Sequence, residues 1–409
     1  MKKMVIQAPG RINLLGEHLD YNQGIVLPAA INRFIEFEFT ENANDAILIE
    51  ALDLNETWVF ELAQLNELQT AGWKSYVKGV FLLLDINESI KGLHIRFKST
   101  IPIGAGLSSS AALCCGLAFG LNEWLGLGKT RMELALLAQQ TEHQYAGVQC
   151  GLMDQVASLF GKEAHLLAFD CLSQEIQAFQ LPLLGVQLFL IDSKVKHNLA
   201  ESAYNERRAQ LESAWLLTQD VFPDLESWRA INEAQLQVVL THLDQSTQKR
   251  LRYVVDEMSR VQKVQKLAAQ ISDDLNDVSL MNEHYRDLGS CINQTHEGLR
   301  DLYEVSCEEI DFLQAALLNL PGILGARMMG GGFGGCLLVL AQNNLDFASL
   351  ESMTFTYKEQ YGFSPRIERI DIVDGVQFFS IWSSVKHELS IPSKSTLSSI
   401  PKPAAISAK

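Results

Sequence analysis

The sequence lacks a long uninterrupted hydrophobic run. A helix that spans a membrane needs about 20 mainly apolar residues, and the most apolar stretch, residues 107–127, is broken by serines, Asn122 and Glu123. Residues 1–10 are basic, but their apolar run ends almost at once, which is not typical of a signal peptide. We therefore expect a soluble, cytoplasmic protein without a membrane partner.

Paired cysteines and protein-held zinc motifs are also missing. The chain has 7 cysteines, an odd number, and contains neither a CxxC nor an HExxH pattern. Small secreted proteins rely on even-numbered disulfide frameworks, whereas cytoplasmic proteins keep their thiols reduced. The pattern therefore predicts free, mostly buried thiols and no metal cage built from cysteine or histidine.

Positive charge is scarce. Lys and Arg number 33 against 49 Asp and Glu, which gives a formal net charge of -16. Such a field repels the phosphates of nucleic acids and anionic lipid heads, so neither is an expected partner. A nucleotide such as ATP can still bind, because helix N-termini and backbone amides supply a local positive field.

The length of 409 residues and the 47 % hydrophobic content predict two packed domains with a cleft between them. We place the N-terminal domain at 1–180 and the C-terminal domain at 181–388, followed by a mobile tail of Ser, Pro, Lys and Ala at 389–409. Residues 204–320 are charged and almost free of Gly and Pro, which predicts a helical layer. Predicted strands are 4–7, 25–28, 33–40, 46–50, 92–98, 164–169, 186–191, 336–341 and 366–373. Predicted helices span 107–125 and run from a capping box at Thr130 and Glu133 toward Tyr145.

Two glycine motifs resemble nucleotide sites but have the wrong context. Gly128-Lys129-Thr130 lacks the glycine that a P-loop needs five residues earlier, and we interpret it as a helix end followed by a helix start. Residues 330–335 match G-x-G-x-x-G, yet a strand pattern follows where a dinucleotide site requires a helix. Neither motif predicts a Rossmann or P-loop protein.

Residues 101–112 carry a better phosphate signal. Gly104 and Gly106 permit close backbone approach, and Ser108, Ser109 and Ser110 stand where an apolar helix begins. The free amides of a first helical turn bind phosphate, and hydroxyls there can contact phosphate or magnesium. Taken alone, the same residues would also fit an ordinary capped helix start.

Residues 8–22 concentrate polar side chains in a segment that we predict to be a loop. Each hydroxyl of a sugar needs a donor or an acceptor placed for it, which this density would provide. A solvated loop would use Lys, Ser and Gly instead. Further along, Asp154 stands among apolar neighbours after Gly151, where it is either a helix cap or a catalytic carboxylate that a nearby arginine keeps ionised.

Three segments together resemble the galactokinases of the GHMP kinase superfamily. Residues 10–22, GRINLLGEHLDYN, are similar to the galactokinase signature G-R-x-N-L-I-G-E-H-T-D-Y-N. Residues 102–111 resemble P-x-G-A-G-L-S-S-S-A, and residues 325–336 resemble G-A-R-M-x-G-x-G-F-G-G-C. The similarity extends from Ala8 to about Ala341.

This resemblance implies an α+β fold of two domains: a ribosomal protein S5 domain 2-like N-terminal domain and a ferredoxin-like C-terminal domain. ATP and the sugar would bind in the cleft between them, with Mg²⁺ as cofactor, and the enzyme would be a monomer. The implied reaction is transfer of the γ-phosphate to the anomeric hydroxyl of galactose.

The resemblance also implies roles for individual residues. Arg11 and Asp154 would face the anomeric oxygen, and Ser110 with Glu142 would bind magnesium. The sugar would be held by Glu17, His18, Asp20, Gly151 and Tyr204. The phosphates would be held by Gly104, Ala105, Gly106, Leu107, Ser108, Ser109 and Ser110.

The sequence departs from the family pattern at Leu19, Leu172, Ala203 and Met329, which leaves the identity of the sugar open. Related GHMP kinases act on N-acetylgalactosamine, arabinose, uronic acids or mevalonate. A second alternative is a galactose and ATP sensor that has no catalytic activity.

Overall fold

The computed structural model describes residues 2–42, 45–86, 90, 92–102, 104–196 and 200–379. Residues 2–379 belong to one compact unit. The tail predicted at 389–409 lies outside the described residues, as do residues 380–388 of the predicted C-terminal domain.

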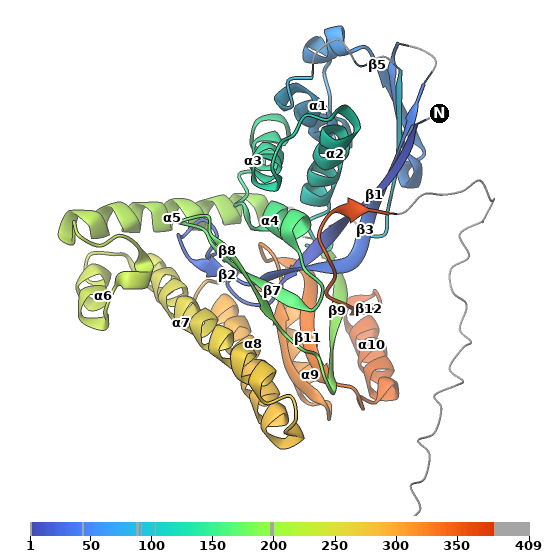
Figure 1. Cartoon of the computed structure of the whole chain (residues 1–409). Helices are drawn as coiled ribbons and strands as arrows, with labels where there is room; N and C mark the ends of the chain where they lie inside the picture. The colour runs from blue at the N-terminus through green and yellow to red at the C-terminus, as the bar shows by residue number, and fades with distance from the viewer. Residues whose placement is uncertain are drawn as a thin grey trace, which may run out of the picture. The chain divides into compact units, whose positions relative to one another are not determined.

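The first sheet has six strands in the order β13-β1-β3-β6-β4-β5, antiparallel except for the parallel pair β4 and β6 (Figure 1). Phe37 and Phe39 of β3 are fully buried, and the glutamates that alternate with them face outward. This period of two is what a half-buried strand requires. The strands are β1 (Lys3–Asn13), β3 (Pro28–Glu41), β4 (Ile47–Ala51), β5 (Glu56–Phe60), β6 (Leu93–Ser99) and β13 (Gln377–Phe378).

Helix α2 (Ser109–Leu125) packs against one face of this sheet. A Cβ atom at Gly116 or Gly120 would overlap the rings of Phe37 and Phe39, so these glycines allow the helix to approach the sheet closely. Beside α2 lie α1 (Trp73–Leu83), α3 (Arg131–Thr141) and α4 (Met153–Phe160), and a π-helical turn, Glu142–Ala146, packs against α1 and α3.

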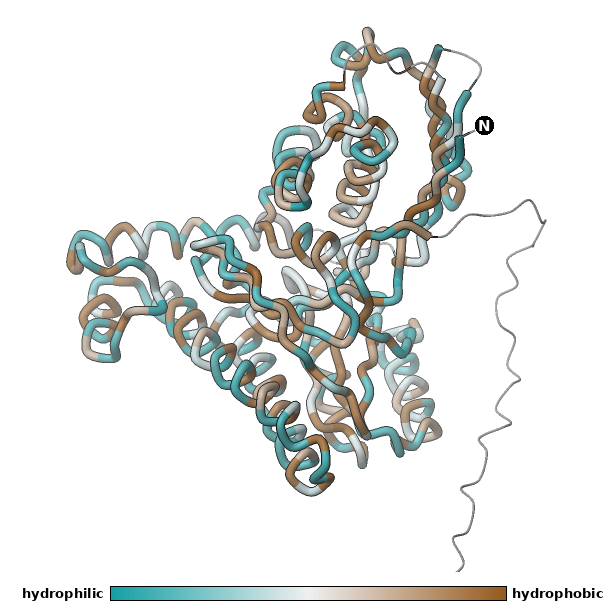
Figure 2. Tube along the Cα trace, viewed as in Figure 1, coloured by the Kyte–Doolittle hydropathy of each residue, from teal (hydrophilic) through white to brown (hydrophobic). Residues whose placement is uncertain are grey.

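A second sheet, in the order β10-β11-β9-β12, forms the other main layer (Figure 1). Its four antiparallel strands are β9 (Val186–Lys196), β10 (Ile323–Met328), β11 (Gly334–Gln342) and β12 (Arg366–Ile370). The central strands are strongly hydrophobic, whereas the long helix α7 alternates between hydrophobic and hydrophilic residues (Figure 2). This alternation gives α7 one face for packing and one for solvent.

Helices α8 and α9 pack against β10, and α7 packs against α8. The helices of this half are α5 (Ala200–Val221), α6 (Glu233–Leu240), α7 (Gln245–Asp273), α8 (Val278–Asp301), α9 (Glu308–Leu318) and α10 (Phe347–Tyr361). A small third sheet is formed by β2 (Ile25–Val26), β7 (His165–Asp170) and β8 (Ile176–Gln180). Short 3-10 turns span Leu52–Leu54, Leu62–Glu67 and Trp228–Ala230. No helix in the described ranges is long and apolar enough to cross a membrane.

The fold confirms the predicted α+β class, the helical layer at 204–320 and the capping box of Thr130 with Glu133. It also confirms that a strand, β11, follows the glycines at 330–335. The expectation of a loop at residues 8–13 is wrong, because β1 continues to Asn13, and the strand predicted at 366–373 ends at Ile370. The domain boundary between residues 180 and 181 stays a prediction.

Candidate active site

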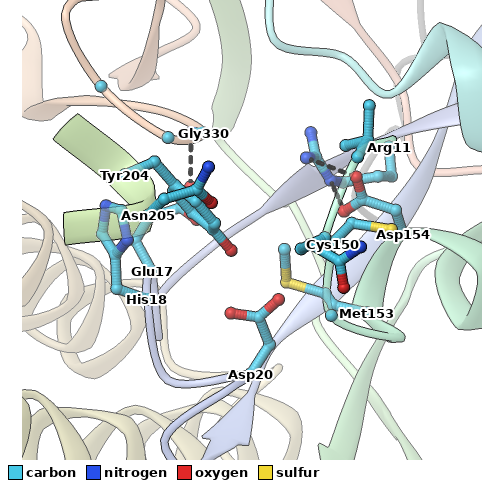
Figure 3. A pocket seen from close by; sticks show the side chains of 15 residues that line it. Arg11, Glu17, His18, Asp20, Cys150, Met153, Asp154, Tyr204, Asn205 and Gly330 are labelled. Carbon is cyan, nitrogen blue, oxygen red and sulfur yellow. Dashed lines mark hydrogen bonds and ion pairs between the residues drawn. The ribbon is translucent and has the colours of Figure 1, made fainter. Parts of the chain in front are cut away.

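A pocket of about 340 Å³ opens at the end of β1, and Figure 3 shows the side chains that line it. Its walls come from β1 and the turn after it, from the segment before α4, from α5 and from the glycine turn after β10. The volume is in the range of small-molecule sites. The polar side chains that line it are Arg11, Glu17, His18, Asp20, Gln149, Asp154, Tyr204 and Asn205.

Arg11 and Asp154 form a two-pronged ion pair at one side of this pocket (Figure 3). Arg11 Nε donates to Asp154 Oδ1 at 2.7 Å, and Nη2 donates to Oδ2 at 3.1 Å. Burial lowers the pKa of Arg11, but the charges of Asp154 and Glu17 outweigh it and raise this pKa above its ordinary value. The guanidinium therefore stays charged, and the fork geometry fixes the orientation of the carboxylate.

The backbone brings this pair together from distant segments. Arg11 lies on β1, where its backbone amide donates to the carbonyl of Leu107 and its Nη1 donates to the carbonyl of Gly106 at 2.6 Å. Asp154 lies within the first turn of α4, and the N-cap position of this helix belongs to Leu152. Asp154 is thus not a helix cap, the alternative that its isolated sequence left open.

The predicted phosphate loop adjoins this pair. Gly104 and Gly106 have φ angles of 75° and 72°, a left-handed conformation that favours glycine. Ser108 also has a positive φ, and its hydroxyl donates to Asp154 Oδ2 instead of capping α2. The first-turn amides of α2 therefore have no side-chain cap from Ser108, which is the arrangement that phosphate-binding helices use. Ile103 of this loop lies outside the described residues.

Glu17 is buried, and its carboxylate accepts hydrogen bonds from residues in the second half of the chain. Its Oε1 accepts from Arg327 Nη2 at 3.1 Å and from the backbone amide of Gly330 at 2.9 Å. Burial raises the pKa of Glu17, but the charges of Arg327 and Arg11 outweigh it and lower this pKa below its ordinary value. Glu17 is therefore an ionised acceptor.

His18 lies in a cluster of tyrosines. Its ring is 4.5 Å from that of Tyr303 and 5.7 Å from that of Tyr204, and its Nδ1 is 2.7 Å from the hydroxyl of Tyr21. Burial lowers the pKa of His18 to about 4, so the ring is neutral. Its buried Nε2 has no hydrogen-bond partner among the residues that the structure describes, which leaves it available to a hydroxyl of a ligand.

Asp20 points into the space between the Arg11 pair and Glu17 (Figure 3). Burial and the nearby charges of Asp154 and Glu17 raise the pKa of Asp20 to about 7. A Cβ atom on Gly151 would overlap the carboxylate of Asp20. Gly151 therefore provides the room in which Asp20 faces the pocket.

Glu142 lies beside the phosphate loop, within the π-helical turn that follows α3. Its Oε1 accepts from Gln155 Nε2 at 2.6 Å, and Ser110 also forms a hydrogen bond to it. Burial is the main cause that raises the pKa of Glu142 to about 7. A hydroxyl and a carboxylate are hard oxygen ligands of the kind that Mg²⁺ prefers, so this pair fits the ion. Among the described residues, no group of three or more His, Cys, Asp or Glu side chains could hold a metal.

All seven residues predicted for catalysis and sugar binding line this one pocket. The phosphate loop and Glu142 are not part of its wall, although Gly106 and Ser108 contact the Arg11 pair directly. The sequence reasoning gave no role to Arg327 or to residues 330–332, which the structure places at the site. The resemblance of residues 325–336 to the third family motif was the signal that could have found them.

Two of the departures from the family pattern, Leu19 and Leu172, do not line the pocket. Leu19 is fully buried and packs against Gly24, and Leu172 is exposed on the turn after β7. Met329 is buried next to the pocket-lining Gly330 but does not itself line the pocket. The side chain of Ala203 lies outside the described residues.

Family models match three parts of the chain. Residues 75–162 match the N-terminal domain of GHMP kinases, and residues 278–352 match the C-terminal domain of GHMP kinases. Residues 1–37 match the galactokinase galactose-binding signature. The chain therefore has the two-domain GHMP kinase fold that the sequence resemblance implied.

Individual relatives narrow this class. The chain is 36 % identical to a galactokinase of Thermotoga maritima, over 91 % of this chain and 99 % of that protein. It is 37 % identical to a galactokinase of Thermosipho africanus with the same coverage. The structure of Lactococcus lactis galactokinase complexed with galactose is similar with a TM-score of 0.83 and 29 % identity, covering 92 % of this chain and 95 % of that one. A mevalonate kinase of Methanococcus jannaschii shares the fold at a TM-score of 0.63 and 17 % identity. The chain belongs to the galactokinase family of GHMP kinases.

Proposed function

We propose that this protein is a galactokinase, which transfers the γ-phosphate of ATP to the anomeric hydroxyl of galactose. The observation that carries the proposal is the Arg11–Asp154 pair, which faces a pocket lined by side chains suited to sugar hydroxyls. A carboxylate held by a charged guanidinium can accept a proton, and the other polar groups can orient the sugar. Membership of the galactokinase family supports the same reaction.

In this proposal Asp154 accepts the proton of the anomeric hydroxyl as that oxygen attacks the γ-phosphorus. Arg11 stabilises the negative charge that develops on the attacking and transferred oxygens. Glu17, His18, Asp20 and Tyr204 hold the sugar so that the attacking oxygen is aligned. Positioning and charge stabilisation dominate phosphoryl transfer, so these roles are sufficient for the protein.

The nucleotide would bind at residues 104–110, with its phosphates against the first turn of α2. Ser110 and Glu142 would hold Mg²⁺, an ion that neutralises phosphate charge when it is bound. A nearby cation would favour the ionised form of Glu142, whose pKa is otherwise raised to about 7. Gln155 would keep the carboxylate in place through its 2.6 Å hydrogen bond.

We further propose that the enzyme works in the cytoplasm as a monomer. All seven cysteines carry free thiols, and four of them are buried, which suits a reducing compartment. Size-exclusion chromatography with light scattering would test the monomer directly: a mass near 45.6 kDa is expected.

The decisive experiment is a panel of sugars assayed for ADP release with MgATP. Galactose is expected to give the highest kcat/KM, with galactose 1-phosphate as the product. Faster turnover with N-acetylgalactosamine, arabinose or a uronic acid would redirect the assignment within the superfamily. Galactose binding by calorimetry without any turnover would identify the alternative, a sensor that has no catalytic activity.

A further inference from the structure

Arg327 is a fully buried arginine on β10, outside the pocket wall, and the proposed mechanism does not use it. Its guanidinium donates to the carbonyl of Leu14 at 2.9 Å, to the carbonyl of Met328 at 2.8 Å and to the carbonyl of Asn13. One of these carbonyls belongs to Asn13, the last residue of β1, and one to Leu14, the first residue of the turn that follows. Arg327 therefore connects the second sheet to the start of the pocket-lining turn.

The same guanidinium also binds the carboxylate of Glu17 at 3.1 Å. The backbone amide of Gly330, three residues beyond Arg327, donates to the same oxygen at 2.9 Å. Asn13 donates to the other oxygen, Oε2, at 3.3 Å. Arg327 and Gly330 both belong to the third family motif, and Glu17 belongs to the first. The third motif therefore supplies both donors to Oε1 of Glu17.

A buried ion pair of this kind is sensitive to the loss of either partner. Removing one charge leaves the other buried without compensation, which is strongly unfavourable. Lysine cannot replace the arginine fully, because an ammonium group lacks the planar fork that reaches three carbonyls and a carboxylate together. The position therefore requires arginine for geometry as well as for charge.

We propose that Arg327 is a positioning residue for sugar recognition, which acts by fixing the carboxylate of Glu17 and the backbone at Asn13 and Leu14. This inference rests on the proposed function, because it assumes that Glu17 binds the sugar. In this inference the third motif orients a side chain of the sugar site. Gly330 lies against Gly106 of the phosphate loop, so one turn adjoins both substrate regions.

The pocket-lining turn is also held from the opposite side, which provides a control. Glu257 of α7 is buried and accepts the backbone amide of Gly16 at 2.8 Å, and Tyr253 donates its hydroxyl to the carbonyl of Glu17 at 3.1 Å. These two contacts reach only the backbone of the turn. A change at Glu257 therefore loosens the turn without removing a partner of the Glu17 carboxylate.

The test compares Arg327→Lys with Glu257→Gln in the full-length protein, by calorimetric binding of galactose and of MgATP. We expect Arg327→Lys to weaken galactose binding by about tenfold or more, with MgATP affinity changed less than about twofold. Glu257→Gln should weaken galactose binding clearly less. Equal galactose affinity in Arg327→Lys and wild type would overturn the inference.

A double variant separates positioning from a general effect on the fold. In a Glu17→Gln background, Arg327→Lys should cause a much smaller further loss of galactose affinity, because the carboxylate that it positions is already gone. If the fold-loss of galactose affinity in the double variant equals the product of the fold-losses in the two single variants, the inference is contradicted. Non-binding of galactose by the wild type would reject only the proposed substrate, and the sugar selected by the panel would then serve in the same comparison.

A stability measurement covers the case in which Arg327→Lys does not fold. Glu17→Gln leaves the Arg327 charge buried without its carboxylate, so its melting temperature should fall by several degrees. Asp20→Asn is the matched control, because within the described ranges the carboxylate of Asp20 forms no ion pair with an arginine or lysine. An unchanged melting temperature in Glu17→Gln would show that the ion pair does not hold the turn.

Discussion

Ser108 donates a hydrogen bond to Asp154, so a residue of the expected phosphate loop contacts the expected proton acceptor. Arg11 binds the same carboxylate and also the carbonyl of Gly106 in that loop. The groups proposed to hold the phosphates and the group proposed to take the proton therefore form one connected network. Such a connection favours a fixed geometry between the attacking oxygen and the phosphorus.

Asp154→Asn should lower kcat by about a hundredfold or more, because the amide cannot accept the proton or carry the charge that Arg11 compensates. The KM values for galactose and ATP should change little. Steady-state kinetics measures both. A loss confined to the galactose KM would assign Asp154 to sugar binding alone.

A matched control for this variant is Asp170→Asn. Asp170 is held in the same two-pronged way by Arg229, at 2.7 and 3.0 Å, but it does not line the pocket. Its replacement should affect stability without a comparable loss of kcat. Similar losses in both variants would mean that breaking an arginine pair, rather than losing a proton acceptor, causes the effect.

Ser110→Ala and Glu142→Ala should each raise the Mg²⁺ concentration needed for half-maximal turnover by about tenfold or more. The reason is the loss of one of two hard oxygen ligands. Titration of turnover with Mg²⁺ at fixed ATP measures the change. Glu133→Ala, which removes a carboxylate that only caps α3, should leave the Mg²⁺ requirement unchanged. An unchanged requirement in both Ser110→Ala and Glu142→Ala would place the ion elsewhere.

Gly151→Ala should weaken galactose binding about as much as Asp20→Ala does, roughly ten- to a hundredfold, because the added methyl group displaces the Asp20 carboxylate. MgATP affinity should stay close to that of the wild type. The double variant should bind galactose little worse than Asp20→Ala alone, since the displaced atoms are then absent. Additive losses, measured by calorimetry, would indicate that Gly151 contacts the sugar independently.

The raised pKa of Asp20 predicts a specific dependence on pH. In the unfolded chain this carboxyl loses its proton near pH 4, whereas in the folded protein it keeps the proton until about pH 7. The folded state therefore binds more protons in this window, and its stability falls as pH rises from about 4 to 7. Glu142, whose pKa is also raised to about 7, adds to the same trend.

Asp20→Asn removes this contribution, so the variant should melt at a higher temperature than the wild type at pH 8 and closer to it at pH 5. Galactose affinity of the wild type should increase as Asp20 ionises near pH 7, because a carboxylate accepts hydrogen bonds from hydroxyls more strongly than a carboxylic acid does. This increase should be absent in Asp20→Asn. Thermal melts and calorimetry at both pH values test this. A constant difference in melting temperature across the range would contradict the assignment.

Local signals accounted for much of the fold. The Thr130 capping box, the apolar helix that begins at the serines and the strand that ends the run of glycines at 330–335 all follow from short patterns, and the structure has them. The end of β1 could not be predicted, because Pro9 and Gly10 are usual in turns, and β1 stays extended there through pairing with β3 on both sides of a register shift at Gly10.

The site was predictable only where the chemistry is local. Asp154 and Arg11 are 143 positions apart, and no periodicity brings them together; the family resemblance supplied that pairing. Arg327 was missed for a similar reason. Its partners Asn13, Leu14 and Glu17 lie more than 300 positions away, and three of its contacts are to backbone atoms that leave no trace in the sequence.

The return of the chain to its first sheet affects how the protein is made. Phe378 of β13 pairs with Ile6 of β1, and Gln377 pairs with Gln7. The last described strand therefore pairs with the outer edge of the first strand. During synthesis, β1 has an open edge until more than 370 further residues have left the ribosome. The first sheet therefore cannot reach its final strand order in any ribosome-bound fragment that lacks residues 377 and 378.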